Sequence, residues 1–501
     1  MSRLVLQLLG SSGTTMANLP YFFMVHGSRS EFDVGFSSML KVDDNNFLLT
    51  KTTASTYVTS GPGAGSARAN RIFRLTPTAD GHPALTEAGI VNGKSNCVFM
   101  PNSSFTQNVR TGNWVCMETN GSTGQSGREE TLWLKFNSDT AYIEEAKIQG
   151  SSTQAMPGQN YASNHAKSHS RHGFMLLHNQ FAASGGTYPY SGLFEMYNSN
   201  GTLKWRKGLS KDGFIFAVLA IRSFDILEDG AMWINGNDYN ACTTASGNLS
   251  WKKAFSDISE PLLGRLEKVS SYYYTRDQVN KFVRIANPTS SSVTFDHLQM
   301  NTSGTTNGNP FGHADIDDNQ TKLNVGQGEY YYRNMTMKNA NDDIWLAYGN
   351  ALALYRPSTN KFIGRYVLKL DSNGTVKSRI HSMEATATGV MVIGTVYDDD
   401  SSNAGEMGFI MHLKNDGSST MSAKDFACFD TNDLTDNVTD VTLAITWTTL
   451  DLTVTWTSST GSNVTSLGTT FSTSADMKTG MSGDGVSNQT DALFGSNTKT
   501  M

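Results

Sequence analysis

A hairpin turn that recurs one repeat further along the chain constrains the fold of this 501-residue sequence more than any other feature. Residues 200–207 read NGTLKWRK and residues 246–253 read SGNLSWKK, which places Trp205 and Trp251 at a separation of 251 − 205 = 46 residues. Glycine in such a turn supplies the positive φ of a tight hairpin, and the alternating apolar strand before it indicates one buried face. A single hairpin cannot bury that face, so neighbouring repeats must stack.

The same unit recurs in weaker form elsewhere in the chain. A third turn at Asn373-Gly374 and a fourth at Asp416-Gly417 are separated by 417 − 374 = 43 residues. Short strands repeated every 40–50 residues or so are typical of β-propeller blades. Alternating strands before these turns are predicted to be outer strands, and more continuously apolar segments are predicted to be inner strands. The predicted inner strands are residues 47–50, 113–117, 232–236, 344–348 and 390–394.

These repeats predict an all-β chain with a β-propeller over residues 30–427. Seven blades fit the spacing best, with six or eight as alternatives. The predicted blades are residues 30–92, 93–150, 160–211, 212–262, 263–325, 326–382 and 383–427. Residues 1–29 are predicted to form an N-terminal strand or arm, with residues 4–9 as a packed strand rather than a cleaved signal.

Residues 428–501 differ in composition from the repeats. Two Thr/Val-rich segments, residues 441–447 and 452–456, predict a β-hairpin. Residues 457–501 consist mostly of Ser, Thr, Gly and Asn and contain almost no core-forming residues. Such a segment should be ordered only against a partner surface. We therefore expect a C-terminal β-hairpin and polar arm that contact other subunits in an assembly.

Composition and charge exclude several classes of partner. Charged residues make up 17% of the chain and the net charge is −6, so no basic surface for nucleic-acid phosphates is expected. No apolar run reaches the 18 or so residues of a membrane span, which argues against membrane insertion. The four cysteines, Cys97, Cys116, Cys242 and Cys428, form no C-x-x-C pair. Buried free thiols are favoured over a Cys97–Cys116 disulfide between adjacent strands.

The dense histidine cluster is the main candidate metal site in the sequence. His165, His169, His172 and His178 would face one ion only if their segment were helical. A polar loop with solvated imidazoles is the favoured interpretation. The acidic segment 315–319 begins like a calcium loop but lacks its glycine and glutamate, and segment 398–400 is a second acidic turn. Incidental acidic loops are the favoured interpretation of both, with weak calcium sites as the alternative.

No motif in the sequence identifies a reaction. The glycine-rich segment 61–65 lacks the Lys and Ser/Thr of a phosphate-binding loop. Nucleophile-elbow and zinc-helix motifs do not occur either. Tyr188 and Tyr190 could stack on a glycan, but the pattern is nonspecific. We predict no catalytic residue, no cofactor and no bound metal, and therefore no enzyme activity.

The turns at 200–205 and 246–251, together with residues 369–374, resemble the repeats of bacterial propellers, including quinoprotein-like ones. That resemblance implies the fold and not the activity, because the regular blade tryptophan is lacking. The divergent blades and the Thr/Val/Ser/Gly-rich C-terminus also resemble virion structural proteins of tailed bacteriophages, marine cyanophages in particular. The implied function is a non-enzymatic virion component of the tail, as a nozzle, baseplate or fibre part.

The implied partners are other virion structural proteins, copies of the chain in a symmetric assembly, and a host surface glycan or receptor. A contribution to host attachment is part of this expectation. The alternatives are a capsid decoration protein and a secreted propeller lectin or glycan-active enzyme.

Overall fold

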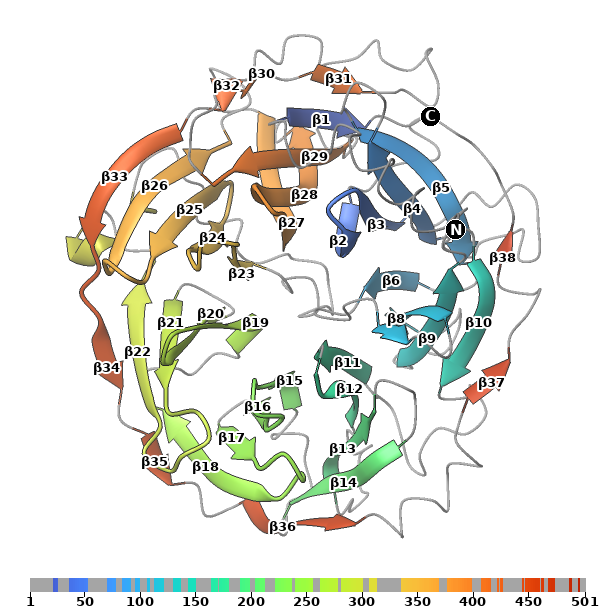
Figure 1. The fold of residues 1–501 in the computed structure, drawn as a ribbon, viewed down its shortest axis with the longest axis vertical. Helices are drawn as coiled ribbons and strands as arrows, with labels where there is room; N and C mark the ends of the chain where they lie inside the picture. Colours follow the sequence, from blue (N-terminus) through green and yellow to red (C-terminus); the bar gives the residue numbers. More distant parts are fainter. Residues whose placement is uncertain are drawn as a thin grey trace, which may run out of the picture.

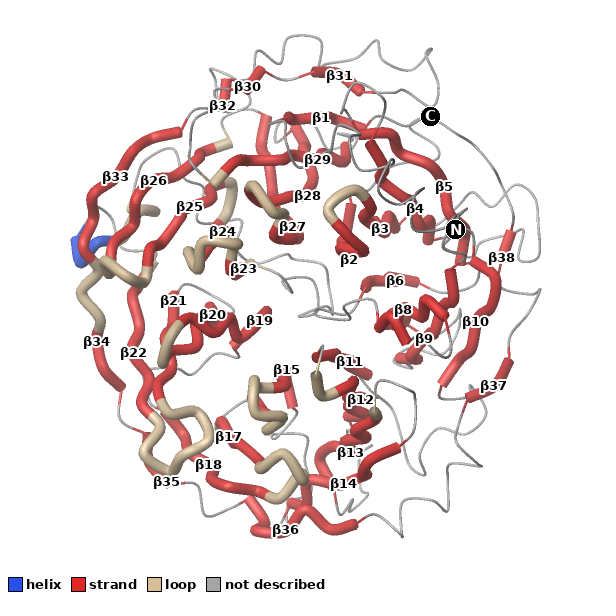
Figure 2. Tube along the Cα trace, in the orientation of Figure 1, coloured by secondary structure: helices blue, strands red, loops and turns tan. Residues whose placement is uncertain are grey.

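The part of the chain that the computed structural model describes is all-β, with mostly strands and almost no helix. The residues that it describes are 21–25, 36–52, 70–77, 83–91, 95–99, 106–108, 112–120, 129–136, 143–149, 164–169, 171–179, 190–198, 203–211, 221–236, 239–255, 262–277, 281–300, 306–312, 335–368, 376–398, 407–415, 421–422, 424–426, 444–445, 447–459, 461–463, 467–473, 486–488 and 494–495. Within them, one short 3-10 helix, η2 (Thr306–Gly308), accompanies the strands (Figure 2).

Seven larger open sheets lie side by side around a common centre (Figure 1). We number them by the position of their first strand after residue 30. The first sheet contains β2 (Phe36–Asp43), β3 (Asn46–Thr52), β4 (Asn70–Pro77), β5 (Pro83–Val91) and β38 (Phe494–Gly495). The second contains β6 (Ser95–Phe99), β7 (Thr106–Asn108), β8 (Gly112–Asn120), β9 (Glu129–Phe136), β10 (Ile143–Gln149) and β37 (Val486–Asn488).

The next three sheets repeat the order of the first. The third contains β11 (Asn164–His169), β12 (Gly173–Asn179), β13 (Tyr190–Tyr197), β14 (Leu203–Lys211) and β36 (Leu467–Thr473). The fourth contains β15 (Ile221–Ile226), β16 (Met232–Gly236), β17 (Asn240–Thr243), β18 (Leu249–Phe255) and β35 (Gly461–Asn463). The fifth contains β19 (Leu262–Val269), β20 (Tyr272–Asp277), β21 (Lys281–Ala286), β22 (Thr294–Gln299) and β34 (Thr457–Ser459).

The last two sheets bring the chain back to its start. The sixth contains β23 (Thr336–Lys338), β24 (Ile344–Tyr348), β25 (Ala351–Arg356), β26 (Lys361–Val367) and β33 (Trp447–Thr453). The seventh contains β27 (Val376–Ala385), β28 (Gly389–Asp398), β29 (Met407–Lys414), β1 (Tyr21–Val25) and β31 (Lys424–Phe426). A separate small sheet pairs β30 (Met421–Ser422) with β32 (Ala444–Ile445).

The N-terminal strand completes the last sheet. β1 pairs antiparallel with β29, with Tyr21 opposite His412 and Val25 opposite Gly408. The innermost strands of the seventh and first sheets, β27 and β2, also contact each other. The seventh sheet thus combines a strand from near the N-terminus with strands from residues 376–426, which fastens the last repeat to the first. Residues 4–9, predicted to be a strand, lie outside the described residues.

Apolar clusters fill the spaces between successive sheets. Strand β24 shows why, because its five residues are all buried and alternate between two clusters. Trp345 and Ala347 face the seventh sheet, whereas Ile344, Leu346 and Tyr348 face the fifth. Residues 390–393 of β28 alternate in the same way between the sixth and first sheets. A strand covered on both faces needs a continuous apolar sequence.

The strand order corrects the predicted position of the apolar segments, which are second strands and not the innermost ones. Residues 47–50, 113–117, 232–236, 344–348 and 390–394, predicted to be inner strands, belong to β3, β8, β16, β24 and β28, the second strand of each sheet's main order. The innermost strands are β2, β6, β11, β15, β19, β23 and β27 (Figure 1). Second strands are sandwiched between neighbouring sheets, and innermost strands carry the charged residues described below.

The predicted repeat boundaries agree with the first five sheets to within a connecting segment. The boundary at residue 382 is wrong, because β27 begins at Val376 and pairs with β28 rather than with β26. The turn at Gly247 is confirmed. Gly247 has a φ of 76°, and its N–H donates to the Thr244 carbonyl at 2.9 Å. The related turn at Asn373-Gly374 falls between the sixth and seventh sheets, outside the described residues.

The prediction of a C-terminal β-hairpin is wrong. The predicted turn between its two strands lies inside a single strand, β33, which pairs with the outer edge of β26. An unpaired sheet edge offers a full ladder of backbone hydrogen bonds, and residues 447–453 use that edge instead of folding back on themselves.

The described strands of residues 457–501 also pair with the chain's own sheets. Strands β34, β35, β36, β37 and β38 are the outer strands of the fifth, fourth, third, second and first sheets. We call residues 447–495 the C-terminal belt. It lies outside the ring and passes the sheets in the reverse of their chain order (Figure 1). We expected this polar segment to be ordered only against other subunits. For these strands that expectation is wrong, because they pair with sheets of the same chain.

Candidate functional site: polar ties between neighbouring sheets

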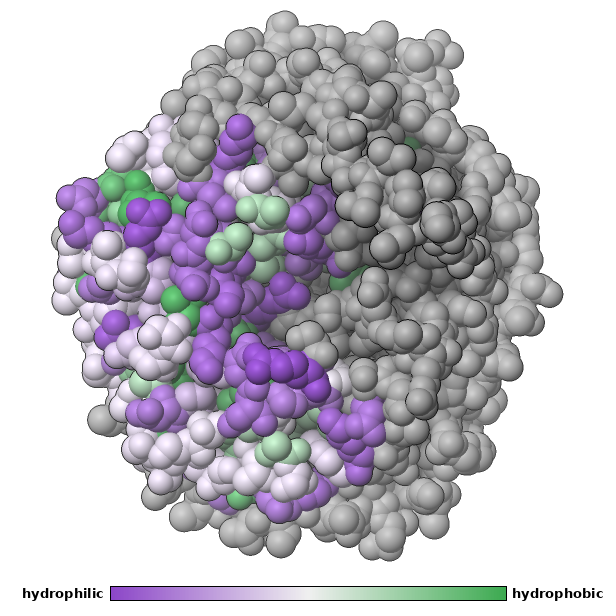
Figure 3. Space-filling view, in the orientation of Figure 1, coloured by the Kyte–Doolittle hydropathy of each residue, from purple (hydrophilic) through white to green (hydrophobic). Residues whose placement is uncertain are grey.

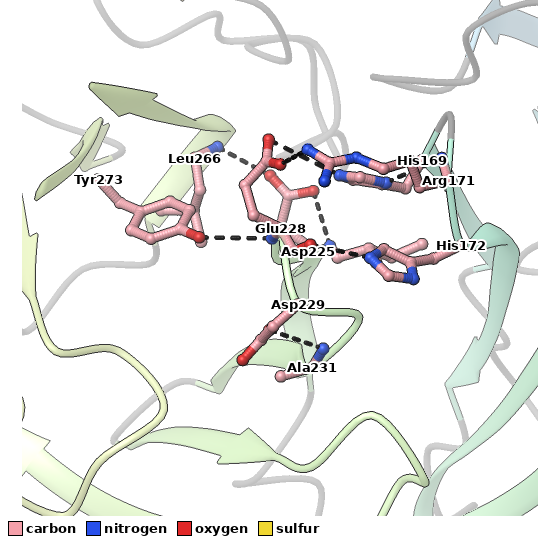
Figure 4. Close-up of polar contacts among 10 residues, drawn as sticks. His169, Arg171, His172, Asp225, Glu228, Asp229, Ala231, Leu266 and Tyr273 are labelled. Atoms are coloured by element: carbon pink, nitrogen blue, oxygen red, sulfur yellow. Dashed lines mark hydrogen bonds and ion pairs between the residues drawn. The ribbon is translucent and has the colours of Figure 1, made fainter. Parts of the chain in front are cut away.

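Two short turns on neighbouring sheets form the polar cluster shown in Figure 4. Arg171 and His172 lie in the turn between β11 and β12, and Glu228 lies in the turn between β15 and β16. The second turn is closed by backbone hydrogen bonds from Leu227 N to Ala231 O at 2.8 Å and from Gly230 N to Leu227 O at 2.9 Å. Gly230 has a φ of 84°, which only glycine adopts readily.

Glu228 is the common partner in this cluster. Arg171 donates from Nη2 to Glu228 Oε2, and His169 Nε2 lies 3.8 Å from Oε1. His172 Nε2 lies 2.9 Å from the Glu228 backbone oxygen. The Glu228 N–H donates to the hydroxyl of Tyr273, on the fifth sheet, at 3.3 Å. One turn of the fourth sheet is thereby tied to both of its neighbours (Figure 4).

The ionisation of His169 follows from this setting. Burial lowers the pKa of His169, the neighbouring His172 lowers it further, and Glu228 acts in the opposite direction. The imidazole is therefore neutral at pH 7. The ring centroids of His169 and His172 are 4.7 Å apart. A protonated pair would be repelled at that separation.

The predicted histidine cluster does not converge on one point. His165 and His169 lie on β11, and His178 lies on β12, so the segment is extended rather than helical. Four residues along a strand span roughly 13 Å, which separates His165 from His169 by more than one ion can bridge. Among the residues that the structure describes, no three His, Cys, Asp or Glu side chains are grouped as metal ligands. The helix that a shared metal would require is not formed, and the favoured interpretation, a polar loop with solvated imidazoles, is wrong as well, because three of the four histidines lie on strands and the His169 side chain is only 14% exposed.

Other predicted candidates are placed only in part. Segments 61–65, 315–319 and 399–400, together with Tyr188, lie outside the described residues. Cys97 and Cys116 are on the paired strands β6 and β8, but Phe99 faces Met117, so the two cysteines are offset by about three positions. Cys242 is a buried free thiol, as predicted, and burial raises its pKa to about 12.

A second polar group lies on the innermost strands, and we call it the central ion-pair network. It consists of Arg265 and Glu267 on β19 and Glu384 on β27. Arg265 Nη1 lies 3.4 Å from Glu384 Oε2 and 4.0 Å from Glu267 Oε1. The side chain of Glu384 is 4% exposed, that of Glu267 13% and that of Arg265 22%. Two carboxylates from different sheets thus share one guanidinium.

Burial and charge oppose each other in this network. Burial raises the pKa of Glu384 and of Glu267, and the Arg265 guanidinium lowers both in part. For Arg265, burial alone would lower the pKa, but Glu384 and Glu267 raise it above its ordinary value. The guanidinium therefore stays charged and compensates the two carboxylates.

Acidic side chains on innermost strands also reach the backbone of the next sheet. Asp225 on β15 accepts from the Leu266 N–H of β19 at 2.7 Å. Glu267 has a hydrogen bond with the backbone of Lys338 on β23, and Glu384 has one with the backbone of Lys41 on β2. Lys41 returns a bond from its Nζ to the Ala385 carbonyl at 2.7 Å. At three junctions, therefore, a carboxylate of one innermost strand is hydrogen-bonded to the backbone of the neighbouring sheet.

Sequence reasoning missed these ties. A signal was present, because each carboxylate stands two residues before an apolar or Thr residue that ends the innermost strand or begins its turn. The three segments are Asp225-Ile-Leu227, Glu267-Lys-Val269 and Glu384-Ala-Thr386. Isolated charges in short strands carry little weight, since most such residues are solvent-exposed.

The surface around these ties is polar. Figure 3 shows the described part of one face of the ring, where hydrophilic residues predominate and apolar residues are scattered. Within the described residues, no helix has the length and apolar character of a membrane span. The arrangement ties sheets together through fixed ion pairs and hydrogen bonds.

Comparison with known proteins adds no assignment. No protein-family model matches the chain, and no curated protein matches its sequence.

Proposed function

We propose that the seven larger sheets are the blades of a seven-bladed β-propeller. Each has a main order of four strands, and the order within the sheet follows the chain in six of them. The seventh is completed by β1 from the N-terminal segment. Contacts of β27 with β2 join the last blade to the first, as a closed ring of blades requires.

We further propose that the chain is a non-enzymatic structural component of a bacteriophage virion, located in the tail as a nozzle, baseplate or fibre part. The C-terminal belt carries this proposal, because it adds an outer strand to six sheets while β31 adds one to the seventh. The belt strands are themselves the outer edges, and four of them, β34, β35, β37 and β38, are only two or three residues long. Such short edge strands disfavour strand addition between copies, and their pairing stiffens the ring. A part that must persist outside a cell benefits from both.

The polar ties support the same function. Arg265 is engaged with two carboxylates, and Glu228 with Arg171 and the His172 ring. Ion pairs shared between sheets hold the blades in register. In the assembly, the partners are other virion proteins and further copies of the chain, and a host glycan or receptor is contacted during attachment. Those contacts use the polar face of the ring that Figure 3 shows.

Purified particles of the virus that encodes the chain provide the test. The chain should sediment with intact particles, and gold-labelled antibody should bind the tail. Labelling of the capsid surface would instead indicate a decoration protein. Absence from particles would refute the virion proposal, and turnover of a polysaccharide by the purified chain would favour the glycan-active alternative.

A further inference from the structure

Residues 447–459 contact the ring in the manner of a bound peptide. The first part, β33, pairs with the outer edge of β26, with Trp447 opposite Tyr366. The last part, β34, pairs with the outer edge of β22, with Ser459 opposite Phe295. One extended segment thus adds a strand to two neighbouring sheets in succession.

The first tryptophan fills a pocket in the sixth sheet. The Trp447 ring centroid lies 4.9 Å from that of Tyr366 and 6.2 Å from that of Trp345. Its indole also lies directly over Gly364 of β26, where even an added Cβ would overlap the ring. The missing side chain at Gly364 is therefore what admits the indole.

The second tryptophan fills an aromatic pocket between the fifth and sixth sheets. The Trp456 ring lies 5.4 Å from Phe282 and 6.0 Å from Tyr355. The Arg284 guanidinium lies 4.7 Å from the centroid of Trp456 and 4.7 Å from that of Tyr272. A cation held between two aromatic faces is a strong contact for an indole.

Between the two pockets, Asn360 clamps the backbone. Its Nδ2 donates to the Val454 carbonyl at 2.8 Å, and its carbonyl accepts from the Val454 N–H at 2.9 Å. Its Oδ1 accepts from Trp456 Nε1 at 2.8 Å. Val454 is buried, while Thr448 and Thr453 face solvent. Anchors that face inward and threonines that face outward are the pattern of a strand-adding ligand.

We propose that the outer edges of the fifth and sixth sheets form a binding site for an extended peptide with two tryptophans nine residues apart, occupied by residues 447–459 as an exchangeable strand. The proposal goes beyond the structural function, because it treats residues 447–459 as a ligand that the rest of the ring binds. The pockets are built from ring residues, namely Gly364, Tyr366 and Trp345 for one and Phe282, Tyr355 and Arg284 for the other. A strand of the same sequence supplied separately should fit them equally.

The test uses the full chain with two protease cleavage sites, one inserted between Phe426 and Ala444 and one between Asn463 and Leu467, so that residues 444–463 are cut free from the rest of the belt. After folding and cleavage, this segment should remain bound during gel filtration. A fluorescent synthetic peptide of residues 444–463 should then exchange into the site, with a saturable rise in anisotropy. The far-ultraviolet circular dichroism of the ring should be unchanged.

Matched variants distinguish specific binding from adhesion. Peptides with Trp447→Ala or Trp456→Ala should bind at least about 30-fold more weakly, as expected for an aromatic anchor. Thr448→Ala, at an exposed position, should bind unchanged. In the cleaved chain, Gly364→Ala should weaken binding of the natural peptide to a similar extent.

Three outcomes would overturn the proposal. The cleaved chain could lose its β-sheet signal, which would make the belt an integral part of the ring. The natural peptide could fail to exchange. The peptide carrying both alanine substitutions could bind as well as the natural one, a result that stands even if Gly364→Ala fails to fold.

Discussion

Arg265 is a residue at which removal of a single charge should strongly reduce stability, because two carboxylates share its guanidinium. The substitution Arg265→Met keeps most of the side-chain volume and leaves Glu384 and Glu267 without their shared cation. Removing one partner of a buried ion pair costs about 3–5 kcal/mol. Because the Arg265 side chain is 22% exposed, we expect a loss at the lower end, about 3 kcal/mol in the free energy of unfolding near pH 7.5.

The loss should depend on pH in a defined direction. Burial raises the pKa of Glu384 and Glu267 in the folded chain, and Arg265 opposes that shift. Without Arg265 both folded-state pKa values rise further above the unfolded value of about 4.3. A raised carboxyl pKa means that the folded state binds more protons, so stability falls as the pH rises through that folded-state pKa. The deficit of Arg265→Met should therefore be greatest at neutral pH and smaller near pH 5.

Urea unfolding of the wild type, Arg265→Met and the double variant Arg265→Met/Glu384→Gln at both pH values is the assay. Glu384→Gln removes one uncompensated charge, so the double variant should regain part of the loss at neutral pH. Lys361→Met is the control, because its partner Asp451 is 81% exposed and such pairs contribute less than about 1 kcal/mol. An equal deficit at both pH values, or further loss in the double variant, would refute the reasoning.

Three further substitutions and treatments test other parts of the fold. Gly247→Ala should destabilise the chain by about 1 kcal/mol in thermal unfolding, since its φ is 76° and the new Cβ would lie 3.0 Å from Trp205. Ser246→Ala, which removes only exposed hydrogen bonds to Thr244 and Asn248, should cost less. Cys242 should resist alkylation at pH 8 in the folded chain and react only in denaturant, because burial raises its pKa to about 12. Rapid labelling of the native chain would contradict the buried position of this thiol. Asn360→Gly preserves the positive φ of 54° and removes the side-chain clamp, so limited proteolysis should release the belt sooner, and an unchanged cleavage rate would count against the clamp.

Local features of the fold were predictable because they depend on neighbouring residues. The hairpin before Trp251 could be found from Gly247, whose conformation is set within five residues. The apolar alternation of residues 193–197, before the turn at Asn200-Gly201, likewise indicates a strand, which is β13, although it is the third strand of its sheet and not an outer one. Long-range pairing could not be found in this way. Nothing near Trp447 indicates that its partner is Tyr366, which lies 81 residues earlier (447 − 366).

The candidate site was less predictable for the same reason. His169 and His172 were recognised as neighbours in sequence, but their common partner Glu228 belongs to the next sheet. The role of Arg265 could not be predicted from the sequence, because its partner Glu384 lies on another strand 119 residues later in the chain. Ion pairs between sheets leave no spacing pattern of their own in a single sequence. Only the acidic residue two positions before Leu227, Val269 and Thr386 could have indicated them.

The reverse course of the belt has a consequence for how the chain is made. β38 covers the first sheet, so the strand beside β5 is synthesised about 400 residues after it (494 − 91 = 403). Contacts of such separation in sequence slow folding, and they cannot form until the ribosome has released nearly the whole chain. Premature termination would therefore expose the earliest sheets first, one after another, while leaving the later ones covered. Nascent and shortened chains should for this reason be the aggregation-prone forms of the protein.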